Sequence, residues 1–199
     1  MCRLGWLSTH IVAAGVALSL YPQRVQSQDK SSERPAFTSD EREGLRIDTD
    51  SIRNRALGFA FPNPSATFII DRVFGRRIAS QFGGEMPPDY LAWILRDTAA
   101  RQGIAIQVRR NPGLDEAGFR SFMKGIKEGS SGATVLQDDL IWSETRHEAG
   151  VTFRHPSGVY AIRCVARLAG HGDYTICINT YSQDSLALAA VRKGLTFSR

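Results

Sequence analysis

The chain has 199 residues, of which 42% are hydrophobic and 23% are charged, and its formal net charge is +5. This composition is typical of a globular protein and excludes a largely disordered chain. The length suits one domain with flanking segments, and two full domains would be cramped. The basic residues are scattered and form no aromatic-basic recognition motif, so we expect no nucleic-acid partner.

The N-terminus has the pattern of an export signal. Arg3 gives it a basic start, an apolar core runs from Ile11 to Leu20, and Val25 and Ser27 suit cleavage after Ser27. The alternative is an uncleaved membrane anchor, but the apolar run from Leu4 to Leu20 is shorter than the roughly 20 residues that a span needs. We therefore predict that residues 1–27 are a signal peptide and that the protein is exported, to a periplasm or to the medium.

Cleavage would leave a mildly basic chain with two cysteines. Loss of Arg3 and Arg24 lowers the net charge from +5 to +3, which favours only weak attraction to anionic surfaces. We expect membrane contact only through the signal segment or through this weak electrostatic attraction. Cys2 is lost with the signal, and the remaining Cys164 and Cys177 are a candidate disulfide in an oxidising compartment.

After the signal, the sequence predicts a linker and then a single domain. Residues 28–46 are polar and charged and have few aliphatic side chains, so we expect a linker there. Residues 47–199 form the predicted domain. Its first segment, from Ile47 to Pro64, is predicted to be strand-like, because Leu57, Phe59 and Phe61 alternate there with the small residues Gly58 and Ala60.

Two helices are predicted in the middle of the chain, with a strand between them. Residues 87–102 repeat apolar side chains at spacings of three and four, with two prolines at the entry and Gly103 after the end. Residues 104–110 alternate as a strand does. Residues 115–128 form the second helix, with acidic residues at its start and lysines near its end.

The C-terminal part is predicted to be four strands and a final helix. These segments are residues 134–142, 145–155, 159–168 and 174–181, followed by the helix 185–193. The sequences PSG and AGHGD are turns between the last three strands, which therefore form an antiparallel meander. The predicted fold class is α+β, with an antiparallel sheet that ends in a three-strand meander and is packed between helices.

This order of elements resembles the PsbP-like family, an α/β/α sandwich. The resemblance is carried by ALGFAFPNP at residues 56–64, by IAIQVRR and FRSFMKGIKEG at 104–110 and 119–129, and by LALAAVRKGLTF at 186–197. It implies a role in binding and assembly without catalysis. It implies no particular functional residue, because no short motif defines the family.

Three constellations could carry chemistry or binding. His171 and Cys177 are close enough in sequence for a thiolate nucleophile, although Cys177 lies in a strand and not on a nucleophile elbow. We expect no metal site, because His147 and Glu148 lack a second histidine at position 151. No cofactor-binding fingerprint is present. Five arginines form a candidate anion-binding patch: Arg72, Arg76, Arg77, Arg109 and Arg110.

The register of the last hairpin decides whether the disulfide can form. If Leu168 pairs with Asp173, the two cysteines lie directly opposite each other. A shift by one residue places Cys164 opposite Ile178 and gathers apolar side chains on one face, but it sends the sulfur atoms to opposite faces. A sheet covered on both sides would remove the advantage of the shifted register.

Two functions are compatible with these features. The first is an exported, non-catalytic binding or assembly module with a protein or cell-envelope partner. The alternative is an exported cysteine-dependent enzyme that uses Cys177 with His171. The two differ in whether the native protein has a reactive thiol.

Overall fold

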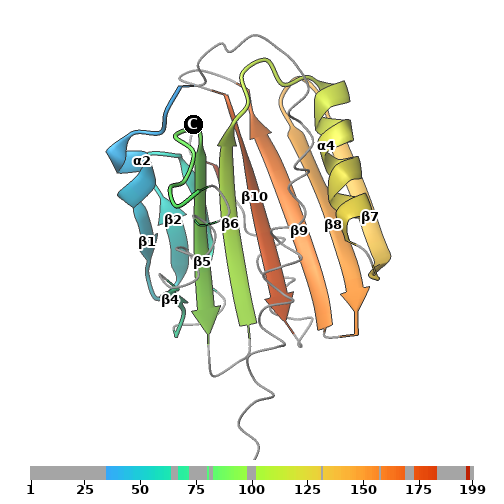
Figure 1. The fold of residues 1–199 in the computed structure, drawn as a ribbon, viewed down its shortest axis with the longest axis horizontal. Helices are drawn as coiled ribbons and strands as arrows, with labels where there is room; N and C mark the ends of the chain where they lie inside the picture. The colour runs from blue at the N-terminus through green and yellow to red at the C-terminus, as the bar shows by residue number, and fades with distance from the viewer. Residues whose placement is uncertain are drawn as a thin grey trace, which may run out of the picture.

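The computed structural model describes residues 35–63, 67–71, 80, 83–97, 102–130, 132–156, 158–168, 173–182 and 196–197. Over these residues the chain is mostly antiparallel sheet with few helices (Figure 1). In chain order the elements are α2 (Ser39–Glu43), β1 (Leu45–Ile47), β2 (Ser51–Asn54), β3 (Phe59–Pro62), β4 (Ile69–Ile70), β5 (Tyr90–Asp97), β6 (Gln102–Arg110), α4 (Glu116–Gly129), β7 (Thr134–Trp142), β8 (His147–His155), β9 (Gly158–Arg167), β10 (Tyr174–Ser182) and β11 (Thr196–Phe197).

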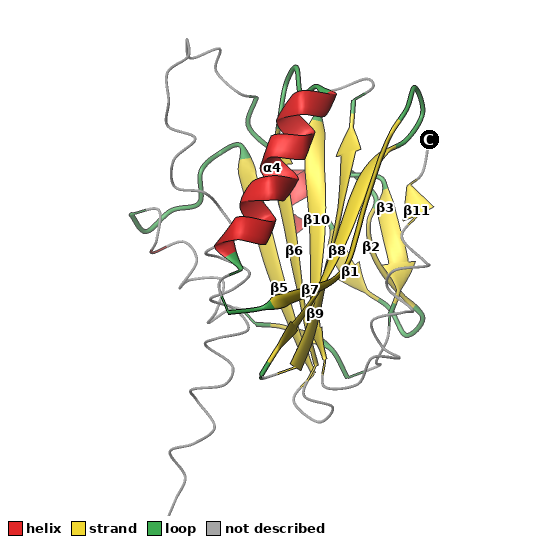
Figure 2. Cartoon of the chain, turned by 90° about the vertical axis from the view of Figure 1, so that its right-hand side faces the viewer, coloured by secondary structure: helices red, strands yellow, loops and turns green. Residues whose placement is uncertain are grey.

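The strands form two sheets, and these sheets and α4 are arranged in three layers. The larger sheet has seven strands in the order β4-β5-β6-β10-β9-β8-β7, and the smaller has the order β1-β2-β3-β11. Figure 2 shows α4 against one face of the seven-stranded sheet and the smaller sheet against the other face. Both faces of the central strands are therefore covered within the described part of the chain.

Two apolar cores separate these layers. Between the sheets, Ile104, Ile106 and Val108 of β6 pack with residues of the smaller sheet such as Phe59 and Phe61. Under α4, a second core is formed by side chains from the helix and the meander: Phe119, Met123, Ile126, Ala149, Val151, Phe153, Tyr160, Ile162, Cys164, Ala166 and Cys177. A strand that faces both cores is apolar on both sides, as in sheets that are buried on both faces.

The helix predicted over residues 115–128 is confirmed as α4. The Asp115 side chain accepts a 2.7 Å hydrogen bond from the Gly118 amide, which caps the first turn. Phe119, Met123 and Ile126 are buried at helical spacing against the meander. Near its end, Lys127 forms a 2.6 Å ion pair with Asp138 of β7, which ties the helix to the edge of the sheet.

The C-terminal meander is also confirmed, and it is longer than predicted. β7, β8, β9 and β10 pair antiparallel in sequence order, and β6 then adds to the outer side of β10. The predicted strands at 134–142, 145–155, 159–168 and 174–181 match these elements closely. Alternating apolar residues and short connections between these segments were sufficient signals here because each pairing is local in sequence.

The helix predicted over residues 87–102 is wrong. Residues Tyr90–Asp97 form β5, which pairs antiparallel with β6 along its length. Leu91 and Leu95 face the core between the sheets, while Tyr90 is buried on the opposite face. Apolar residues on both faces of a strand produce spacings of three and four that resemble a helical stripe.

The expected cover of helices on both faces also differs from the structure. Among the described residues, α4 covers one face and the smaller sheet covers the other (Figure 2). The predicted final helix at 185–193 lies outside the described residues, as does the predicted signal segment at 1–27. In the part of the chain that is described, no helix combines the length and apolar character needed to cross a membrane.

The predicted linker at residues 28–46 overlaps the fold. Its described part contains α2 and β1, and the Phe37 side chain is only 4% exposed. The folded unit therefore includes Phe37 and the residues that follow it, before the expected boundary at Ile47. The contacts of this N-terminal segment form the candidate site described next.

Candidate functional site

The candidate site is formed where residues 37–43, here called the strap, lie across the ends of β6 and β10. The strap contains α2, which begins with a capping box: the Glu41 amide donates to Thr38 Oγ1 at 3.3 Å, and the Thr38 amide donates to Glu41 Oε2 at 2.8 Å. None of the residues within this five-residue helix is buried. A helix this short is not stable alone, so its position depends on contacts with the sheet.

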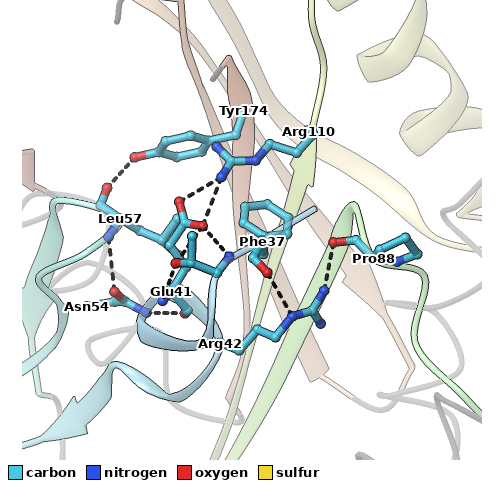
Figure 3. A network of polar contacts seen from close by, with 9 residues as sticks. Phe37, Glu41, Arg42, Asn54, Leu57, Pro88, Arg110 and Tyr174 are labelled. Atoms are coloured by element: carbon cyan, nitrogen blue, oxygen red, sulfur yellow. Dashed lines mark hydrogen bonds and ion pairs between the residues drawn. The ribbon is translucent and has the colours of Figure 1, made fainter. Parts of the chain in front are cut away.

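The main contact is a largely buried ion pair between Glu41 of the strap, which is partly exposed, and Arg110 at the end of β6, which is buried. One guanidinium nitrogen of Arg110 donates to both Glu41 carboxylate oxygens, at 2.7 and 2.9 Å (Figure 3). The side chains of Arg110 and Glu41 are only 5% and 12% exposed. The guanidinium carbon of Arg110 also lies 4.2 Å from the centre of the Phe37 ring. Arg110 therefore holds the strap through an anion and an aromatic ring together.

Main-chain bonds hold the beginning of the strap against the entry to β5. The Phe37 amide donates to the Pro88 carbonyl at 2.9 Å. Arg42 donates to the same carbonyl at 2.7 Å and, through Nε, to the Phe37 carbonyl at 3.1 Å. These bonds set the position of the Phe37 ring over Arg110.

Asn54 joins the strap to the turn between β2 and β3. Its side-chain amide donates to the Glu41 carbonyl at 2.8 Å, and its Oδ1 accepts from the Leu57 amide at 3.0 Å. Asn54 is fully buried. The Tyr174 hydroxyl donates to the Leu57 carbonyl (Figure 3), so both backbone polar groups of Leu57 are bound by buried side chains. The turn, the strap and β10 are thus linked by one polar network.

Arg110 and Tyr174 are directly opposite each other in the pairing of β6 with β10. Opposite residues in an antiparallel pair point to the same face, and here that face is the one covered by the smaller sheet. Burial raises the pKa of Tyr174 above its ordinary value, and the nearby guanidinium groups of Arg167 and Arg110 offset only part of that effect. Tyr174 is therefore neutral at physiological pH and acts as a hydrogen-bond donor.

We call the group that receives the strap the cradle, and it comprises Asn54, Leu57, Pro88, Arg110 and Tyr174. It binds a carboxylate, an aromatic ring and two stretches of backbone.

Of the five arginines in the predicted anion patch, the structure describes only Arg109 and Arg110, and it places them on different faces. Arg109 and Arg110 are adjacent in β6, so their side chains point to opposite faces of the sheet. Arg110 is bound to Glu41, whereas Arg109 is 30% exposed and lies 4.0 Å from Asp89. Arg72, Arg76 and Arg77 lie outside the described residues. The structure thus brings Arg110 into the cradle and leaves Arg109 outside it.

The two predicted disulfide cysteines lie directly opposite each other in β9 and β10. Their sulfur atoms are bonded at 2.07 Å, in the register where Cys177 pairs with Cys164. Both side chains point into the core under α4. The shifted register would gather apolar residues on one face, but that gives no advantage here because both faces are covered. His171, the proposed partner of Cys177 in an active site, lies outside the described residues.

A second charged cluster lies on the face that also carries Arg110. Glu148 of β8 contacts Arg146 and Arg163, and its side chain is only 11% exposed. The two arginines and the single carboxylate leave part of the positive charge uncompensated within the cluster. Among the described residues, no group of three or more His, Cys, Asp or Glu side chains is placed to hold a metal ion.

Sequence reasoning missed Phe37, Glu41, Asn54 and Tyr174 as parts of a site. One local signal was present, because Thr38 and Glu41 have the spacing of a capping box and indicate a helix start within the predicted linker. The pairing of Glu41 with Arg110 joins residues 69 positions apart. No pattern in the sequence specifies such a contact.

Comparison with known proteins finds likeness at the level of the fold. No family model matches the chain, and no curated protein matches it. A crystal structure from Bacteroides thetaiotaomicron VPI-5482 is similar with a TM-score of 0.35 and 9% identity, over 71% of this chain and 46% of that one. The Ran-binding protein Mog1p of Saccharomyces cerevisiae is similar with a TM-score of 0.39 and 12% identity, over 76% of this chain and 96% of Mog1p. The expected PsbP-like resemblance therefore stays a weak one, and it concerns the fold only.

Proposed function

We propose that the chain is an exported, non-catalytic binding or assembly module with a protein or cell-envelope partner. The observation that carries this proposal is the disulfide between Cys164 and Cys177. These are the two cysteines that remain after cleavage of the predicted signal, and such bonds persist in oxidising compartments. The disulfide therefore supports export, either to a periplasm or to the medium.

The same bond weakens the alternative of a cysteine-dependent enzyme. A thiolate is the nucleophile in such enzymes, and the sulfur of Cys177 is bonded to Cys164. Cys177 is also only 6% exposed, so a substrate would have to enter the core under α4 to reach it. Within the described part of the chain, we find no observation that favours this second function.

The cradle supports a binding role. It already holds a segment of polypeptide through an ion pair, a ring contact and main-chain hydrogen bonds. These are the contacts by which proteins recognise peptide segments. Of the two partner classes, the cradle favours a protein partner over a cell-envelope polymer.

Thiol quantification and fractionation together test this proposal. We expect tagged protein in the exported fraction to begin at Gln28 and to show no reactive thiol before reduction, then two thiols after reduction in denaturant. A single thiol that reacts rapidly in the native protein would reject the proposal and support the enzyme. Full-length protein retained in the membrane fraction would instead indicate an uncleaved anchor.

A further inference from the structure

The strap contacts the cradle through a charged side chain, an aromatic ring and backbone groups of the same chain. Arg110 is almost fully buried, and Glu41 is the carboxylate that compensates its charge. Opening the strap takes both the carboxylate and the ring away from this guanidinium, so a segment that replaces the strap would regain these contacts by supplying a carboxylate. The Phe37 ring also stacks on the Arg110 guanidinium, so a segment that replaces the strap would need an aromatic residue as well as a carboxylate.

The strap is also placed so that it can open without unfolding the sheets. It lies at the N-terminal end of the described fold, α2 buries none of its own residues, and Phe37 is its main apolar anchor. Segments with few buried apolar contacts open at lower free energy than the core strands. Leu57 and Tyr174 belong to the core between the sheets, and Arg110 is held in the pairing of β6 with β10, so these cradle residues are positioned independently of the strap.

We propose that the strap is a tethered occupant of a peptide-binding site, and that a partner protein displaces it with a segment carrying an aromatic residue and, four positions later, a carboxylate. This spacing is that of Phe37 and Glu41. The inference rests on the proposed binding function and names the chemistry of the partner. Displacement would release residues 37–43 and join the partner to the end of β6.

The size of the effect follows from occupancy. If the strap is seated at least ten times as often as it is open, the apparent affinity for a competing peptide falls at least about tenfold. The strap competes at the effective concentration of a short tether, which is on the order of millimolar. Weakening the strap therefore raises peptide affinity without changing the cradle.

The test uses the full exported chain with the double substitution Phe37→Ala and Glu41→Gln, which weakens the strap and leaves every cradle residue intact. The probe is an acetylated and amidated peptide with the sequence PAFTSDERE, residues 35–43. Titration calorimetry should show binding to the variant at least about tenfold tighter than to the wild-type protein. The same peptide with both substitutions should not bind.

Two further variants serve as controls. Adding Arg110→Met to the double variant should abolish peptide binding, because the guanidinium that holds both anchors is gone. Adding Arg120→Gln, on the exposed surface of α4, removes one positive charge elsewhere and should leave binding unchanged. If the variants with Arg110→Met and with Arg120→Gln lose peptide binding equally, the peptide is held by non-specific charge attraction and the proposal is wrong.

A folded double variant that does not bind the peptide would overturn the proposal, and so would equal binding to wild-type and variant protein. Circular dichroism and a cooperative urea transition establish that the variant is folded. If it is unfolded, hydrogen exchange of the wild-type protein decides instead: the Arg42 amide must exchange faster than the amides of β6, and equal protection would overturn the proposal. Loss of peptide binding in these experiments would reject the strap proposal alone, because the proposed function is tested separately by thiol reactivity and fractionation.

Discussion

Replacing Cys164 and Cys177 with alanine together tests how much the cross-strand disulfide stabilises the fold. The bond joins residues separated by 13 positions, and the loop-closure entropy that it removes from the unfolded chain is worth about 3 kcal/mol near room temperature. The two side chains are 0% and 6% exposed, so truncation to alanine adds a small cavity term of about 1 kcal/mol. We expect the free energy of unfolding to fall by about 3–4 kcal/mol.

Urea unfolding of three samples measures this change. Oxidised wild-type protein is the reference, and reduced wild-type protein is the matched control because it loses the bond but keeps both sulfur atoms. Reduction should lower the free energy of unfolding by about 3 kcal/mol, and the double variant should lose slightly more. A loss below about 1 kcal/mol in both samples would refute the chain-entropy reasoning. Pairing of β9 with β8 and of β10 with β6 would then hold the hairpin without the bond.

Three other substitutions test the polar network and the sheet edge. Tyr174→Phe should cost about 1 kcal/mol at pH 7, because the hydroxyl bond to the Leu57 carbonyl is lost. Burial raises the pKa of Tyr174 from 10.0, so its contribution is full below that pH and is lost as the pH rises through the higher folded-state pKa. The variant should lack this alkaline component in urea titrations, and an unchanged pH profile would contradict the assignment. Asn54→Ala should cost about 2–4 kcal/mol in thermal or urea unfolding, because it leaves the Glu41 carbonyl and the Leu57 amide without their buried partner; a loss similar to that of an exposed asparagine would reject the bridging role. Asp139→Val in the edge strand β7 should promote self-association in sedimentation experiments, because charges on exposed edges oppose strand pairing; a strictly monomeric variant would show that another feature protects this edge.

The parts of the fold that were predictable depend on contacts that are local in sequence. α4 begins at a side-chain cap on Asp115 and buries residues at helical spacing, and both signals lie within Asp115 and the fourteen helical residues that follow it. The meander is similarly local, because each strand pairs with the next across a short turn. These elements were therefore identified correctly from pattern alone.

The errors arise where distant segments decide the structure. β5 pairs with its neighbour β6, but residues of the smaller sheet, distant in sequence, cover one of its faces, and that cover is not visible in its own sequence. The strap has a polar composition typical of a linker, but Arg110 at the end of β6 supplies the partner for Glu41. The hairpin register had two alternatives until the cover on both faces was known. Local sequence patterns do not include the apolar side chains or the opposite charges that residues distant in sequence supply to a segment.

The position of β6 in the strand order has a consequence for the sequence of events during synthesis. β6 lies between β5 and β10, so its second edge is completed only by β10, the last long strand to be made in the described part of the chain. Until then, β5 and β6 form a hairpin with an open edge that is rich in β-branched residues, and such edges are prone to pair with other chains. Formation of the sheet therefore depends on a late, long-range pairing, which is the slow kind of step in folding. A chain released without β10 would present that open edge to its neighbours.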